Sequence, residues 1–199
     1  ALALMRRFQV EAGHENAADE ATFVAHQALA VDASNAEARV ALAGIAWALG
    51  DAVTAAREIL AALHENPRLG DARDLGGRLL IEIGAIDAGI AQLQGASEAE
   101  PGMRPHTIVD IARGLALQGR WSDALASLEK PPTSDPSALN TYWLMRARLV
   151  AWTRDKDMAQ RLLTDLAIAP DFLAKTMALG ILATTVTGQV PHEAMKFLE

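Results

Sequence analysis

Several kinds of residue recur along this sequence with a period of about 34 residues. Four prolines, Pro67, Pro101, Pro136 and Pro170, are separated by 34, 35 and 34 residues. Series of small residues and of glycines keep the same spacing at other positions of the period. They are Ala43, Gly77, Ala112 and Ala147; Ala55, Gly89, Ala124 and Ala159; and Gly50, Gly84 and Gly119. Because independent series share one period, the chain consists of repeats, and two helices per repeat of this length predict a stacked α-solenoid.

Each repeat has the capping and turn residues of a helical hairpin. In the clearest one, Asn35 can cap a first helix over residues 36–49, and Gly50 can take the left-handed conformation that ends it. Asp51 can then cap a second helix, which stops near residue 65 because the residue before Pro67 is biased away from the helical region.

Composition agrees with close helix packing. The chain is 51% hydrophobic but only 5% aromatic, and 41 of its 199 residues are alanine. Alanine is the best helix former, and its small side chain lets helices approach closely. The sequence therefore predicts an all-α protein.

These repeats resemble the tetratricopeptide repeat, whose 34-residue motif places large, small, Gly, Ala and Pro residues at fixed positions. Counted from Ala36, one unit supplies Leu42, Ala43, Gly50, Ala55, Ile59, Ala62 and Pro67. The resemblance implies a right-handed α-solenoid of about five to six hairpins that forms a single domain over residues 1–199. Its units are expected at about 2–34, 36–69, 70–103, 105–136 and 140–170, with a partial unit at 171–199.

Some positions depart from the family pattern. Arg39 stands where the family prefers Trp, and Arg154 occupies a turn position that is Gly in the other units. The proline-rich run at 130–136 is expected to cut the second helix of its unit short. Gly188 is expected at a further mid-unit turn, with a second or capping helix beginning at Pro191.

Charge and motifs exclude several functional classes. A net charge of −7 and a pI near 5.2 argue against a general nucleic-acid binder, which needs a basic surface. The sequence has no cysteine, Gly-rich phosphate loop, nucleophile elbow or paired-histidine zinc helix. We therefore expect no catalytic activity, no cofactor and no metal.

The ends of the sequence and its apolar runs bear on localisation. The chain starts at Ala1 without an initiator methionine or a signal-peptide layout, so we expect a piece of a longer protein. Its longest uncharged run, Thr176–His192, is too short and too polar to cross a membrane. The expectation is a soluble protein, cytoplasmic or periplasmic, without membrane insertion.

The family resemblance also implies a binding surface. In tetratricopeptide repeats the first helix of each hairpin lines a concave face, and one of its positions here holds Arg78, Arg113 and Arg148 in three successive units. Guanidinium groups suit carboxylates, so this ladder predicts a protein or extended peptide ligand and makes an acidic segment a candidate. The other concave-face candidates are Val40, Trp47, Asp74 and Trp152.

A local alternative stays open for two of the arginines. Asp74 precedes Arg78 by four residues and Asp110 precedes Arg113 by three, so each pair can satisfy itself and add only about 0.2–0.5 kcal/mol. Arg148 has no such acid. The tryptophans have a packing alternative, which applies least to Trp152.

The function expected from these features is a non-catalytic scaffold that binds a protein or peptide within a larger assembly. Two alternatives remain. The repeats can serve as a self-assembly or spacer module, with a homo-oligomer as the result, or as the regulatory segment of an enzyme whose catalytic domain lies outside this chain.

Overall fold

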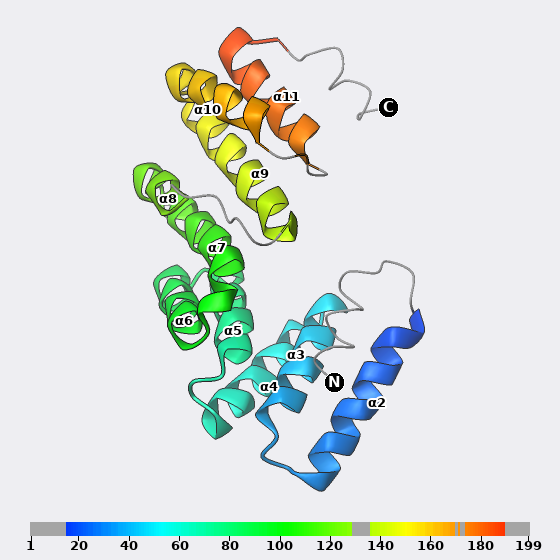
Figure 1. Cartoon of the computed structure of the whole chain (residues 1–199). Coiled ribbons are helices and arrows are strands. Elements are labelled where there is room, and N and C mark those ends of the chain that lie inside the picture. The colour runs from blue at the N-terminus through cyan, green and yellow to red at the C-terminus, as the bar shows by residue number, and fades with distance from the viewer. Residues whose placement is uncertain (1–14, 129–135, 170, 172–173, 190–199) are drawn as a thin grey trace. The chain divides into compact units, whose positions relative to one another are not determined.

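The described residues of the computed structural model, 15–128, 136–169, 171 and 174–189, form consecutive α-helices (Figure 1). The chain divides into two units, residues 1–107 and 108–199, and the boundary falls within α7. The single domain expected from the sequence stays a prediction. The helices are α2 (Glu15–Val31), α3 (Ala36–Ala48), α4 (Ala52–Glu65), α5 (Gly70–Glu82), α6 (Ile86–Ala99), η1 (Pro101–Met103), α7 (Arg104–Leu117), α8 (Trp121–Ser127), α9 (Pro136–Thr153), α10 (Lys156–Ile168) and α11 (Lys175–Thr187).

The predicted all-α hairpins are confirmed, and their turns form as expected. Gly50, Gly84, Gly119 and Gly188 all have φ between 74° and 87°, the left-handed region that glycine enters without steric cost. Asn35 and Asp51 cap α3 and α4 by accepting from the N–H groups of Ala38 and Thr54, at 2.9 and 3.0 Å. At the fourth turn Arg154 takes φ 56° itself, and Asp155 caps α10.

Prolines lie near two helix boundaries, the end of α8 and the start of α9. The second helix of the repeat expected at 105–136 is α8, which has only 7 residues, as the proline-rich run predicts. The next helix, α9, begins at Pro136, four residues before the expected start near Asn140. Proline fits the first turn of a helix because its missing N–H has no partner there. Residues 2–14, 129–135 and 190–199, on which other expectations fall, lie outside the described residues.

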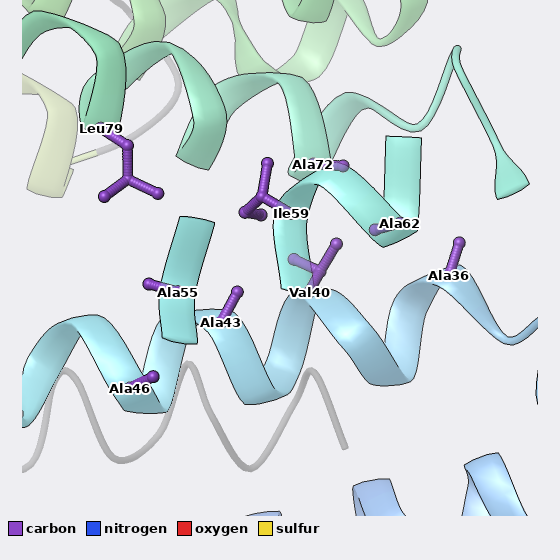
Figure 2. Packing of buried hydrophobic residues seen from close by; sticks show 9 residues of the cluster. All are labelled: Ala36, Val40, Ala43, Ala46, Ala55, Ile59, Ala62, Ala72 and Leu79. Atoms are coloured by element: carbon purple, nitrogen blue, oxygen red, sulfur yellow. The ribbon is translucent and has the colours of Figure 1, made fainter. Parts of the chain in front are cut away.

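Alanine dominates the core of the first unit. Figure 2 shows one cluster that joins α3, α4 and α5. A second cluster joins α2 to the other side of α3 through Ala38, Ala41 and Ile45. Because α3 is buried on two sides, it needs small side chains almost all round. The first cluster contains Ala36, Val40, Ala43, Ala46, Ala55, Ile59, Ala62, Ala72 and Leu79.

Two arginines bind the corners between hairpins, which accounts for the departure at Arg39. The Arg39 guanidinium donates to the carbonyl oxygen of Ala33 at 3.0 Å and to Glu58 Oε2 at 3.1 Å. Arg73, 34 residues later, donates from Nε to the carbonyl oxygen of Pro67 at 2.7 Å. In both repeats, a side chain in the first turn of the helix satisfies a corner carbonyl six residues earlier.

In the second unit, α9 contacts α8, α10 and α11. Tyr142 is fully buried, and its hydroxyl donates to the carbonyl oxygen of Leu128 at 2.5 Å. Arg146 Nη1 donates to the same hydroxyl at 2.9 Å, and Trp143 meets the Tyr142 ring edge-on. This polar contact ties the end of α8 to the buried side of α9.

Candidate functional site

The structure pairs two of the three ladder arginines with the aspartates that the sequence indicates. Arg78 Nη2 lies 2.5 Å from Asp74 Oδ2 in the first unit. Arg113 Nε lies 3.5 Å from Asp110 Oδ1 in the second unit, a longer and weaker contact. Both local pairs are thus confirmed, and the contribution of Arg78 and Arg113 to a ligand ladder stays a prediction.

Arg148 differs from the other two arginines. Its side chain is exposed on α9, and among the described residues it has no hydrogen-bond or ion-pair partner. A guanidinium in this state keeps all of its donors for solvent or for a ligand. Arg148 therefore has the geometry that the ligand-binding interpretation requires.

Three other candidates lie inward. Val40 is 1% exposed and belongs to the core cluster of Figure 2, so a partner cannot reach it. Trp47 is partly buried and packs against the same cluster. Asp74 is 7% exposed and is engaged with Arg78. For Val40 this placement corrects the expectation of a surface role, because the residue faces α4 and α5.

Trp152 lies on the surface, as expected for a binding residue. It is 73% exposed at the end of α9, one turn after Arg148. Its ring stacks on that of Trp121, the first residue of α8, with centroids 5.8 Å apart and planes inclined by 26°. Offset stacking at this distance is a favourable aromatic arrangement, so the exposed ring is held from one side.

The sequence did not single out Leu117, and for Trp121 it indicated packing, which agrees with the stack on Trp152. Leu117 is 61% exposed at the end of α7, four residues before Trp121. The signal was present in the sequence: Leu117 follows Arg113 by four residues just as Trp152 follows Arg148. The Trp121–Trp152 stack, by contrast, depends on how α8 lies against α9.

The described residues contain no group of acids and histidines that could hold a metal ion. Across the same residues, no helix combines the length and apolar character needed to cross a bilayer.

The successive helical hairpins have the fold of tetratricopeptide-repeat proteins. No protein-family model and no curated protein sequence matches the chain.

Among solved structures, the chain is similar to PilF of Pseudomonas aeruginosa, a tetratricopeptide-repeat protein. The TM-score is 0.69 at 21% sequence identity, over 98% of this chain and 95% of that chain. A chain in the structure of Naa15/Naa10 bound to HypK-THB also matches. Its TM-score is 0.47 at 19% identity, over 92% of this chain and 28% of that chain. At these identities the likeness shows the fold alone.

Proposed function

We propose that this chain is a non-catalytic scaffold that binds a protein or an extended peptide within a larger assembly. The observation that carries the proposal is the surface of α9, where exposed Arg148 and exposed Trp152 are one helical turn apart. Arginine and tryptophan are both enriched among the residues that dominate binding energy at protein interfaces. The hairpin fold supports this proposal, since such repeats usually present surfaces to partners.

The proposal is tested by charge reversal. Arg148→Glu and Arg113→Glu are each expected to reduce capture of partner proteins by the full chain at least about tenfold, a loss typical of a charge-assisted contact. The melting temperature of the Arg148→Glu variant should stay close to that of the wild type, because the Arg148 side chain is exposed. Equal loss of capture and of stability would mark these arginines as structural.

Arg161→Glu is the matched control. Arg161 is exposed on α10 of the same unit, so its reversal makes the same change in net charge on a different helix. Capture that falls equally in this control would reflect net charge rather than a site.

Self-assembly is the second candidate, favoured by large apolar side chains exposed on the first unit. Val53, Leu60 and Ile83 are 78%, 70% and 72% exposed. Sedimentation over a range of concentrations separates the two candidates. Dimers without affinity for any partner would favour self-assembly and contradict the scaffold proposal.

A further inference from the structure

Two first helices of the second unit, α7 and α9, share a pattern that α3 and α5 of the first unit lack. In α7, Arg113 is followed four residues later by Leu117, which is 61% exposed. In α9, Arg148 is followed at the same distance by Trp152, which is 73% exposed. Residues four apart share a helix face, so each helix presents a cation beside a large apolar side chain. The corresponding residues of the first unit are Gly44 with Ala48, and Arg78 with Glu82.

Aromatic stacking fixes the apolar part of the α9 surface formed by Arg148 and Trp152. Trp121 lies just beyond the α7–α8 turn, and its ring stacks on Trp152 with centroids 5.8 Å apart. The exposed face of Trp152 is therefore held in place before a ligand arrives. A preorganised ring loses less conformational entropy on binding than a mobile side chain does.

We propose that Arg148 and the stacked rings of Trp152 and Trp121 bind a short extended segment of a partner protein in which an apolar side chain lies next to a carboxylate. This inference rests on the proposed scaffold function and names the class of ligand. The exposed Trp152 ring receives the apolar side chain, and the Arg148 guanidinium receives a carboxylate.

Charge complementarity selects this occupant. Arg148 is exposed and has no ion-pair partner among the described residues, so it meets a carboxylate without first breaking another contact. The chain as a whole carries −7, which opposes a polyanion such as a nucleic acid or an anionic membrane. A local cation beside an aromatic ring on an acidic protein favours a ligand with few negative charges and an apolar centre.

The probes are three capped peptides added to the full chain. The first, Gly-Glu-Phe-Glu-Leu-Gly, carries both features; in the second, lysines replace its glutamates; in the third, alanines replace Phe and Leu. Tryptophan fluorescence reports binding, because the peptides contain no tryptophan and Trp152 is exposed. Saturable binding of the first peptide alone, weakened by salt, is the expected result. Equal binding of the lysine peptide, or binding of none, would overturn the inference.

Variants assign the binding to this surface. Arg148→Glu and Trp152→Ala are each expected to lower the affinity for the first peptide at least about tenfold, as measured by isothermal titration calorimetry. Arg161→Glu and Ile168→Ala are matched controls on α10; Ile168 is 85% exposed, and neither variant should change the affinity. A loss shared by the control variants would contradict the assignment.

The same variants separate this inference from the proposed function. If the chain captures a partner protein that Trp152→Ala and Arg148→Glu leave bound, the ligand class is wrong while the scaffold function stands. If the full chain captures no protein and binds no peptide, both are wrong.

Discussion

Gly77 of α5 and Gly89 of α6 approach so closely that a Cβ atom on either would lie 2.8 or 2.6 Å from the carbonyl oxygen of the other. The preceding hairpin has Ala43 and Ala55 at the same positions of the repeat, both fully buried. The α5–α6 hairpin is thus packed closer than side chains at these positions permit.

Gly77→Ala and Gly89→Ala should each lower the free energy of unfolding by about 1–3 kcal/mol, because the added methyl group forces the two backbones apart. Replacing glycine by alanine also improves helix propensity by up to about 1 kcal/mol, but the cost of the steric overlap is larger. Urea unfolding followed by circular dichroism measures the difference. Gly102→Ala is the control, since nothing lies within 4 Å of its added Cβ; a loss as large there would contradict the explanation.

Gly95 leaves room for the Arg73 guanidinium, which occupies the space that a Cβ at residue 95 would need. Gly95→Ala in the wild-type chain should therefore raise the free energy of unfolding little or not at all, because Arg73 must leave its contact with the Pro67 carbonyl. In an Arg73→Ala background the same change should stabilise by about 0.5–1 kcal/mol through helix propensity. A double-mutant cycle measures the coupling, and additive effects would show that the two residues do not compete.

Arg154 is the one described residue other than glycine with a positive φ, 56°. Side chains with a Cβ are strained there, so Arg154→Gly should raise the free energy of unfolding by about 0.5–1 kcal/mol. Gly119→Ala, at the equivalent turn with φ 74°, should lower it by a similar amount. Thermal unfolding of both variants checks the pair, and a destabilised Arg154→Gly protein would assign the arginine a contact that outweighs its strain.

Tyr142 links stability to alkaline pH. Burial raises the pKa of its phenol, an effect partly opposed by Arg146, so the folded state favours the neutral form. This contribution is present below the ordinary tyrosine pKa of about 10 and is lost as the pH rises through the folded value. Melting temperature should fall above about pH 10 in the wild type and less steeply in Tyr142→Phe.

At neutral pH, Tyr142→Phe should itself cost about 1 kcal/mol, because the buried Leu128 carbonyl loses its donor. Ultraviolet absorbance of the phenolate gives an independent check, since the chain has a single tyrosine. Ionisation at an ordinary tyrosine pKa would contradict the effect of burial.

Much of the hairpin architecture follows from the sequence because its determinants are local. Gly50, Gly84 and Gly119 end helices by their own conformational freedom, and Asp51 caps a helix through an N–H three residues away. The Asp74–Arg78 pair is likewise predictable, since it lies within one helix. The observed start of α9 at Pro136 differs from the expected start near Asn140, because proline is compatible both with a break and with a first helical turn.

The sequence by itself determined the repeat period, the helical class and the residues that can share a helix face. Only the tertiary structure decided that Val40 is buried between helices and that Trp121 stacks on Trp152. It also decided that Arg73 passes over Gly95. The physical reason is the separation along the sequence between the residues that interact. Caps, turns and residues four apart on one helix are set by neighbours along the chain, whereas burial and stacking depend on how separate helices pack.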